Sequence, residues 1–364
     1  MKDVKRHLIV ISGGGTGGPS TAPLALATAY RQLDREARFI FVGSDPQLEQ
    51  KLFAADLQEL GADYYALPAG KWRRYLSWQN FLDVFKIIRA FFLSIILLSR
   101  WRPSLIISAG SFASVPLVWA GRCLGVKILV HQQDLRPGLA NRLMAPLANK
   151  VSVAFAKSLA DYGRKAVLIG NPGKLGSFSP TALEELRRKF KLDSRRPLIL
   201  VTGGGSGSLS LNKLFFAALP LLPADWQIIH QVGQDKGEGA PVRQSYQVFD
   251  NISHDDFSAL WFLADIVVSR AGLGALTEAV LLAKPTVLMP IPKSQQEDNA
   301  AYFAQHQAAI VLDQDTATAN KLAETLKSLW QDEVGRQRMS AKVNSLMPTD
   351  AAKRGAEIIQ ELLA

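Results

Sequence analysis

The sequence contains little cysteine and histidine, and it has no long apolar run. Among its 364 residues Cys123 is the one cysteine, which excludes an internal disulfide and favours a reducing, cytoplasmic setting. Five scattered histidines, without HExxH or a Cys/His cluster, predict no metal site. The longest apolar stretch, Ala90–Leu98, is about half of what a membrane span requires. We therefore expect no transmembrane helix and no signal peptide.

Acidic residues are scarce in the first half of the chain. The first 165 residues contain 22 Lys and Arg but only 11 Asp and Glu, whereas the remainder is almost neutral. This asymmetry indicates an anionic partner for the N-terminal half, such as a phosphorylated substrate, an acidic membrane surface or nucleic acid. A solvated basic surface explains the charge equally well.

Short β-branched runs alternate with helical patterns, which predicts βαβ units and an α/β fold with mainly parallel sheets. Gly170–Gly173 is rich in turn residues, and a second series of strands and helices starts at Leu198. We predict two Rossmann-like domains that face each other across a cleft. Their expected limits are residues 1–165 and 166–350, and the last helix, 351–364, is free to join the first domain.

The same strand–glycine loop–helix device occurs twice. The loops are GGGTGG at Gly13–Gly18 and GGGSGS at Gly203–Ser208. Such a loop lets backbone N–H groups approach an anion, and the helix N-terminus adds positive potential. The first loop also satisfies GxGxxG, so it is compatible with an NAD(P)-dependent oxidoreductase. Two loops in one chain favour an enzyme with a phosphate group on each of two substrates.

A third motif follows a later strand, in the segment SRAGLGALTE at Ser269–Glu278. Glu278 is expected about one turn into a helix, where its carboxylate can accept hydrogen bonds from both hydroxyls of a ribose. A solvated acid near a helix start is the structural alternative. After the next strand, the amides of Gln295, Gln296 and Asn299 are suited to sugar hydroxyls or to helix capping.

These motifs, in the order GGGTGG, GNPGK, GGGSGSLSLN, SRAGLGALTE and QQEDNA, resemble the MurG family over nearly the whole chain. The resemblance implies a GT-B fold and an inverting transfer of N-acetylglucosamine. The donor would be UDP-GlcNAc, and the acceptor would be undecaprenyl-diphospho-MurNAc-pentapeptide, in peptidoglycan synthesis. It implies no cofactor for the chemical step.

By this resemblance the C-terminal half binds the donor and the N-terminal half binds the acceptor. Glu278 would hold the ribose, and the three amides would hold the sugar. The other implied donor residues are Asn171, Lys174, Gly204, Gly205, Ser206, Gly207, Leu273, Gly274 and Ala275. The implied acceptor residues are Gly14, Gly15, Thr16, Gly17, Gly18, Phe112 and Asn141.

Several positions depart from the pattern of the family, mostly on the acceptor side. Pro19 replaces the histidine of GGTGGH, and the HEQN stretch is His131-Gln132-Gln133-Asp134. Gly205 stands at the serine position of the second loop, Lys174 at an arginine and Phe112 at a tyrosine. Inversion requires deprotonation of the acceptor hydroxyl. Our hypothesis is that Asp134 is the base, with His131 as second candidate; a turn-capping role for Asp134 is equally compatible.

Aromatic and basic residues alternate in residues 64–81. Such a segment suits an anionic membrane surface, and the MurG resemblance places a membrane-facing patch there. The residues named for it are Trp72, Arg73, Arg74, Tyr75 and Trp78. The following apolar segment, Phe81–Leu98, is predicted as a helix packed on the sheet, with partial membrane contact as the alternative. Nucleic acid ranks low as a partner, because the sugar-nucleotide motifs explain more of the chain.

The leading function is therefore a UDP-GlcNAc transferase acting on a lipid-linked acceptor at the cytoplasmic membrane face. A related transferase with another lipid-linked acceptor or another nucleotide donor is the alternative within the same class. An NAD(P)-dependent oxidoreductase and a catalytically idle binding protein are the alternatives of other classes.

Overall fold

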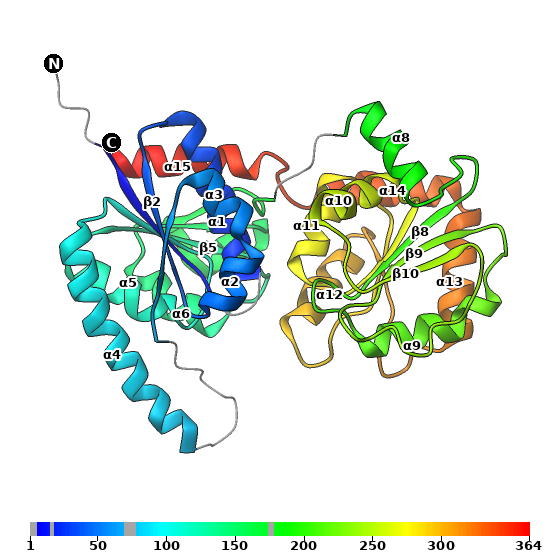
Figure 1. The fold of residues 1–364 in the computed structure, drawn as a ribbon, viewed down its shortest axis with the longest axis horizontal. Helices are drawn as coiled ribbons and strands as arrows, with labels where there is room; N and C mark the ends of the chain where they lie inside the picture. The colour runs from blue at the N-terminus through cyan, green and yellow to red at the C-terminus, as the bar shows by residue number, and fades with distance from the viewer. Residues whose placement is uncertain (1–5, 15–17, 69–77, 174–177) are drawn as a thin grey trace. The chain divides into compact units, whose positions relative to one another are not determined.

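The computed structural model describes residues 6–14, 18–68, 78–173 and 178–364. The chain forms two compact units (Figure 1). One consists of Met1–Gly173 together with Asp350–Ala364, and the other of Lys174–Thr349. The division lies after Gly173 rather than after residue 165, because β7 (Ala166–Leu168) pairs with β6 (Lys150–Val153) in the first sheet.

The first unit is built on a seven-stranded parallel sheet with the order β3-β2-β1-β4-β5-β6-β7. Its other strands are β1 (Leu8–Ser12), β2 (Arg38–Gly43), β3 (Asp63–Ala66), β4 (Leu105–Ser108) and β5 (Lys127–Gln132). Its helices are α1 (Gly18–Leu33), α2 (Pro46–Leu52), α3 (Ala54–Leu60), α4 (Trp78–Trp101), α5 (Ser114–Cys123), α6 (Leu139–Met144), α7 (Leu159–Tyr162) and α15 (Ala351–Leu363), with 3₁₀ turns η1 (Ala145–Leu147), η2 (Ala156–Ser158) and η3 (Gly163–Lys165).

Alternate residues of these strands enter two separate cores, one on each face of the sheet. Ile9 and Ile11 pack with residues of α1, α3 and α15, whereas Val10 packs with residues of α4, α5 and α6. Both faces are therefore covered, as the continuous apolar runs of a parallel sheet require.

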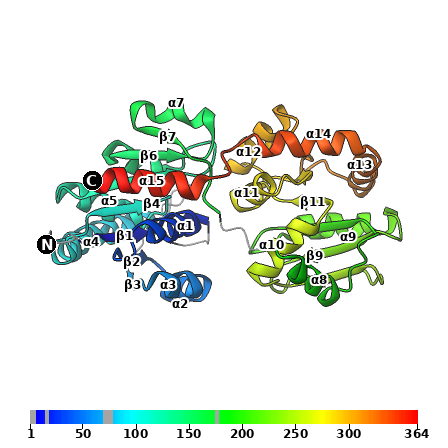
Figure 2. The same cartoon turned by 90° about the horizontal axis from the view of Figure 1, so that it is seen from above.

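The C-terminal helix α15 belongs to the first unit, where it lies along α1 (Figure 2). Its apolar face, including Ala356 and Ile359, packs into the core that α1 also lines. Gly355 faces Leu26 so closely that a Cβ at this position would overlap the leucine side chain. The close approach of the two helices explains why glycine stands there.

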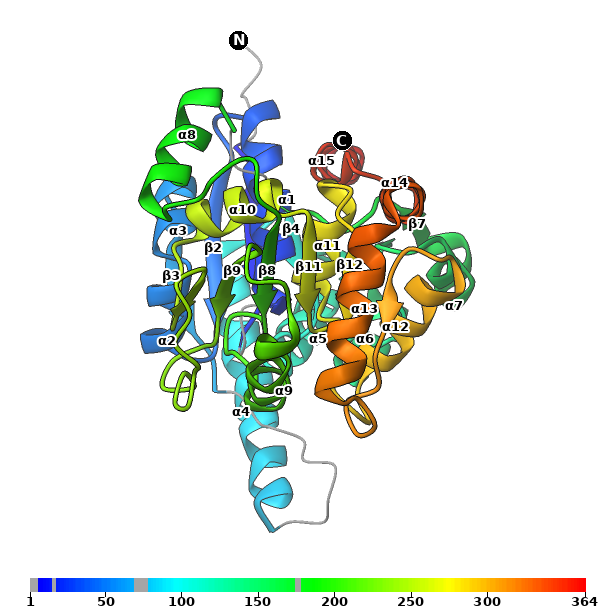
Figure 3. The ribbon, with the colours of Figure 1, turned by 90° about the vertical axis from the view of Figure 1, so that its right-hand side faces the viewer.

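The second unit has a six-stranded parallel sheet with the order β10-β9-β8-β11-β12-β13, in which β9, β8, β11 and β12 lie side by side in Figure 3. The strands are β8 (Leu198–Thr202), β9 (Gln227–Gln231), β10 (Tyr246–Phe249), β11 (Ile266–Ser269), β12 (Thr286–Leu288) and β13 (Ile310–Val311). The helices are α8 (Pro180–Lys189), α9 (Leu209–Ala218), α10 (His254–Leu263), α11 (Leu273–Leu281), α12 (Gln295–Gln305), α13 (Ala319–Gln331) and α14 (Glu333–Asn344), with η4 (Leu219–Leu221).

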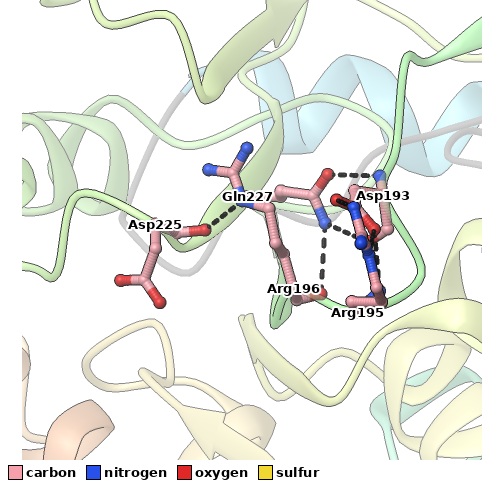
Figure 4. A network of polar contacts seen from close by, with 5 residues as sticks. All are labelled: Asp193, Arg195, Arg196, Asp225 and Gln227. Atoms are coloured by element: carbon pink, nitrogen blue, oxygen red, sulfur yellow. Dashed lines mark hydrogen bonds and ion pairs between the residues drawn. The ribbon is translucent and has the colours of Figure 1, made fainter.

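A polar network closes the amino-terminal edge of this second sheet (Figure 4). The amide of Gln227 accepts from Asp193 N at 2.7 Å and donates to the carbonyls of Asp193 and Arg196. Arg196 in turn donates to the carbonyl of Asp225 at 2.6 Å. These contacts satisfy the backbone of the turn that leads into β8, which is a structural role at the edge where β8 and β9 begin.

Each sheet has a switch point, where the strand order reverses and ligands of open α/β sheets bind at the carboxyl ends of the strands. In the first sheet it lies between β1 and β4, and in the second between β8 and β11. The two glycine loops directly follow β1 and β8. The fold therefore places both predicted anion loops where a ligand site is expected.

Candidate functional site

The second glycine loop, Gly203–Ser208, connects β8 to α9. Gly204 and Gly207 have φ angles of +83° and +68°, and Gly207 N donates to Gly204 O at 3.0 Å. Ser208 caps the helix through a bond from Leu211 N at 3.4 Å. A left-handed loop at the N-terminus of a ten-residue helix is suited to a phosphate group.

Arg270, which the sequence analysis did not assign, lies directly behind this loop at the end of β11. Its guanidinium donates to Ser208 Oγ at 2.6 Å, to Ser210 Oγ at 2.6 Å and to Gln314 Oε1 at 2.7 Å. It also donates to the carbonyls of Met289 and Pro290. All these partners are neutral, and burial lowers the pKa of the arginine. A cation that no described carboxylate neutralises therefore adds positive potential at this switch point.

Glu278 lies in α11, which follows Arg270 after the turn through Gly272. Its Oε2 is buried and has no hydrogen-bond partner among the described residues. Burial raises the pKa of Glu278 to about 7. A buried carboxylate oxygen without a hydrogen-bond partner is costly, which makes Glu278 a candidate for binding a ligand. A solvated helix-start acid, the structural alternative, does not fit this burial.

The predicted sugar-binding amides stand at the start of α12, next to the start of α11. Gln296 Oε1 accepts from Ile291 N at 3.1 Å, and its Nε2 lies 3.6 Å from the position of a Cβ on Gly272. Asn299 is fully buried and donates to Ala271 O at 3.4 Å. Gln295 opens α12, and the residues Leu273, Gly274 and Ala275 form the first turn of α11.

The first glycine loop is described at Gly13 and Gly14, and α1 begins at Gly18. A Cβ on Gly14 would lie 2.8 Å from Ser44 Oγ, 3.0 Å from Ser111 Oγ and 3.2 Å from Glu49 Oε1. These three polar side chains thus line the loop and leave no space for a side chain on Gly14. Gly15, Thr16 and Gly17 lie outside the described residues.

Glu49 is a buried carboxylate beside this loop that the sequence analysis missed. It accepts from Ser44 N at 3.0 Å, from Ser44 Oγ at 3.1 Å and from Tyr64 Oη at 2.7 Å. Burial and this hydrogen bond raise the pKa of Tyr64. Its sequence signal was an acidic residue four positions after Asp45, and Asp45 is the N-cap of α2 after the end of β2. The sequence does not show which loop the Glu49 side chain approaches.

His131, at the end of β5, is fully buried. Its Nδ1 lies 3.0 Å from Ser152 Oγ and its Nε2 lies 3.0 Å from Asn171 Oδ1. Burial lowers its pKa to about 4, so the ring is neutral. This geometry favours a structural role for His131, since both ring nitrogens are occupied. It also places Asn171, predicted on the donor side, in the first unit.

Gln132 fills the position at which the MurG pattern has glutamate. Its Oε1 accepts from Asn141 Nδ2 at 2.7 Å and from Tyr162 Oη at 3.0 Å. Its Nε2 donates to the carbonyls of Asp134 and Arg136, at 2.5 and 3.4 Å. Gln132 therefore holds the turn after β5 in place. Asn141 keeps a buried Oδ1 without a hydrogen-bond partner among the described residues, next to Gly110.

Gln132→Glu is expected to lower the free energy of unfolding by about 1–3 kcal/mol at pH 7.5, because a carboxylate would face two carbonyl oxygens. The pKa of that glutamate would be raised in the folded state. The loss should therefore shrink as the pH falls, since the protonated acid can donate again. Urea unfolding at pH 7.5 and pH 5 measures this difference. Gln58→Glu, at an exposed position of α3, is the control; equal stability of wild type and Gln132→Glu at pH 7.5 would contradict the interpretation.

Asp134 is half-buried in the turn after β5. The neighbouring Gln133 donates from Nε2 to Gly18 O at 3.1 Å, which ties this turn to the start of α1. Asp134 is therefore the next residue after one that contacts the end of the first glycine loop. Phe112 lies in the loop after β4, next to Ser111, whose φ of +80° is unusual for a residue other than glycine.

Lys174, Trp72, Arg73, Arg74 and Tyr75 lie outside the described residues, as does the side chain of Trp78 at the start of α4. In the described parts of the chain, no helix is long and apolar enough to cross a membrane. No group of three potential metal ligands occurs there either.

Two parallel sheets, each with a glycine loop and helix at its switch point, define the GT-B class of glycosyltransferases. A MurG structure from Acinetobacter baumannii has this fold, with a TM-score of 0.76, 23% identity and coverage of 98% of this chain and 99% of that chain. The sequence matches the Glycosyltransferase family 28 N-terminal domain over residues 9–153 and the C-terminal domain of that family over residues 198–360. The chain belongs to glycosyltransferase family 28 and is an enzyme that transfers a sugar.

Two curated relatives carry the name UDP-N-acetylglucosamine--N-acetylmuramyl-(pentapeptide) pyrophosphoryl-undecaprenol N-acetylglucosamine transferase. The one from Clostridium kluyveri is 31% identical, over 97% of this chain and 99% of its own length. The one from Geobacillus thermodenitrificans is 30% identical, over 94% of this chain and 96% of its own length. The MurG resemblance is thereby confirmed, and the oxidoreductase and idle binding protein are not retained.

Proposed function

We propose that this enzyme transfers N-acetylglucosamine, with inversion, from UDP-GlcNAc to a lipid-linked diphospho-muramoyl-pentapeptide. The observation that carries the donor assignment is the buried, unpartnered Oε2 of Glu278, in the helix that follows Arg270 along the chain. Ribose hydroxyls supply the hydrogen bonds that this carboxylate lacks. The names of the relatives support the same donor and acceptor.

On the donor side, different elements at the second switch point bind different parts of the UDP-sugar. Glu278 binds the ribose, and the first turn of α11 lies along the nucleotide. Gln295, Gln296 and Asn299 bind the sugar hydroxyls. The loop Gly204–Gly207 and the start of α9 bind the diphosphate, which is the leaving group. Arg270 stabilises the negative charge that develops on the diphosphate as the anomeric C–O bond breaks.

On the acceptor side, the first glycine loop binds the diphosphate of the lipid-linked substrate. Asn141 Oδ1 is a buried acceptor without a partner among the described residues, and we assign it to a donor group of the acceptor sugar or peptide. Asp134 removes the proton from the attacking hydroxyl, whose oxygen forms the new bond to the anomeric carbon. The products are the lengthened lipid-linked saccharide and UDP.

The surface of α4 supports peripheral binding to a membrane. One face of this helix is buried through Ala90 and Leu98, as the sequence predicted. The opposite face exposes four large apolar side chains at helical spacing, with exposed fractions of 48–63%. They are Phe85, Ile88, Phe92 and Ile96. Exposed Lys86 and Arg89 add positive charge to this face, which suits anionic headgroups.

Replacing Phe92 and Ile96 together by glutamate is expected to weaken binding to phosphatidylglycerol vesicles at least tenfold. Each apolar side chain inserted into the interface contributes on the order of 1–2 kcal/mol, and the new charges are repelled. Sedimentation with vesicles measures the change. Val334→Glu, at an exposed apolar position of α14, is the control. Unchanged sedimentation of the double variant would show that α4 does not contact lipid.

The proposed reaction is tested by release of UDP from UDP-GlcNAc in the presence of a short-chain analogue of the lipid-linked acceptor. We expect release that depends on both substrates. Release with a different lipid-linked acceptor but not with the muramoyl-pentapeptide analogue would support the related transferase instead. A rise in melting temperature with UDP-GlcNAc, but not with NADH, would support the donor independently of the acceptor.

A further inference from the structure

The turn after β9 packs directly against the second glycine loop. The backbones of Gly207 and Gly233 touch, and a Cβ on Gly207 would overlap the carbonyl of Val232. Gly233 has a φ of +90°, so both glycines are required by conformation as well as by space. The turn Val232–Lys236 is thus the segment on which the second glycine loop packs.

The side chain of Lys236 joins this turn to the loop through hydrogen bonds. Its Nζ donates to Ser206 O at 2.5 Å and lies 3.4 Å from Gly207 O. A trans peptide directs its C=O and its N–H in opposite directions. A cation held on the Gly207 carbonyl therefore fixes the direction of the following N–H, that of Ser208, at the N-terminus of α9. The ammonium also neutralises carbonyl dipoles that would otherwise repel a nearby anion.

The backbone of Lys236 is itself held from α9, the helix that follows the loop. Asn212 Nδ2 donates to Val232 O at 3.0 Å and to Lys236 O at 3.1 Å. Asn212 Oδ1 lies 3.1 Å from His230 Nε2, and His230 Nδ1 lies 2.7 Å from Tyr246 Oη. These side chains are buried. A rigid polar chain from β10 through β9 and α9 therefore supports the residue whose side chain reaches the loop.

We propose that Lys236 is a positioning residue for the diphosphate of the donor, acting through the carbonyls of the second glycine loop. This assignment rests on the proposed UDP-sugar function. It predicts that Lys236 contributes to recognition of the diphosphate but not of the nucleoside, because the loop lies by the diphosphate while the ribose is assigned to α11.

The test compares binding of UDP and of uridine to wild type, Lys236→Met, Lys236→Arg and Lys213→Met. Lys236→Met keeps the aliphatic stem, and Lys213 is an exposed lysine on α9 that serves as control. We expect Lys236→Met to weaken UDP binding about tenfold and to change uridine binding less than twofold. Lys236→Arg should recover most of the loss, and KM for UDP-GlcNAc should rise in parallel with the Kd for UDP.

Amide hydrogen exchange of the ligand-free protein provides the second readout. Exchange in residues 203–210 should become faster in Lys236→Met, because the loop loses its tether. If Lys236→Met loses UDP binding but its amide exchange is unchanged, Lys236 contacts the phosphate directly, and the positioning role is wrong. Equal losses for UDP and uridine, or no loss for UDP, would also overturn the proposal. A wild type that does not prefer UDP over uridine would overturn the proposed donor as well, which separates the two failures.

Discussion

Asp134→Asn is expected to lower kcat for sugar transfer by about 10²–10⁴-fold, the range that a general base commonly contributes. The turn that carries Asp134 is bonded to the first glycine loop through Gln133 and Gly18. The two positions at which this chain has lost a titratable group of the family do not supply a base, since Pro19 has none and Gln132 is a neutral amide bonded to two carbonyls. Initial rates of UDP release at saturating donor and acceptor measure the effect.

Asp63→Asn, at an exposed position of β3, is the matched control and should stay within twofold of wild type. The melting temperature of Asp134→Asn should also stay close to that of wild type, so that the loss of rate is not a loss of fold. A variant that retains wild-type turnover would assign Asp134 to the turn rather than to the chemistry.

His131 is the second candidate, and its environment explains why it ranks below Asp134. With a pKa lowered to about 4 it is neutral near pH 7, but both ring nitrogens are engaged by Ser152 and Asn171. To accept a proton from a substrate, the ring must give up one of these bonds inside a fully buried site. We therefore expect His131→Asn to lower the free energy of unfolding more than it lowers the rate of sugar transfer.

Motifs that are contiguous in sequence were the predictable part of the candidate site. A strand, a glycine run and a helix placed in succession fix a loop at the carboxyl end of that strand, and both loops lie at switch points. The helix carrying Glu278 and the helix opening at Gln295 also begin where the motifs indicate. Local chemistry determines these features, since glycine and helix-start residues act within a few positions of themselves.

Contacts between distant segments could not be predicted. Glu49 reaches the loop at Gly14, Arg270 reaches Ser208 and Lys236 reaches Ser206, and each contact joins segments at least 30 residues apart. The local pattern does not show which distant segment each of these side chains reaches. The same limit applies to β13, which has two residues, Ile310 and Val311, and is a strand only through its pairing with β12.

The departures of this chain from the MurG pattern fall mainly in a region that the structure shows to be tightly bonded. Gln132 makes four hydrogen bonds that fix the turn carrying Asp134, and Asn141 joins the same network while keeping one unpartnered oxygen. A neutral amide can satisfy two carbonyls that a carboxylate cannot. The glutamine therefore stands where the geometry of the turn depends on a side-chain N–H group. The acid that remains on this turn is Asp134.

Glu278→Gln is expected to weaken UDP binding about 10- to 100-fold, because hydrogen bonds to a charged acceptor contribute about 1.5–3 kcal/mol. Titration calorimetry with UDP measures this loss, and Glu324→Gln, at an exposed position of α13, is the control. Uridine should lose affinity by the same factor as UDP, because the contact is to the ribose. A gain of UDP affinity in the variant would instead place Glu278 near the diphosphate, because the substitution would then remove a repulsion between like charges.

The same variant is expected to be more stable than wild type at pH 8, by about 1–3 kcal/mol. The pKa of about 7 in the folded protein lies above the unfolded value, so the folded state holds the proton more tightly. The contribution of the protonated Glu278 to the free energy of unfolding of wild type is fully present below the unfolded pKa, near pH 4. It is lost as the pH rises through 7. Denaturant unfolding of both proteins should therefore show a difference that grows between pH 5 and pH 8. Loss of UDP affinity together with gain of stability is the combination expected of a buried carboxylate kept for its ligand, whereas a purely structural acid would lose stability on substitution.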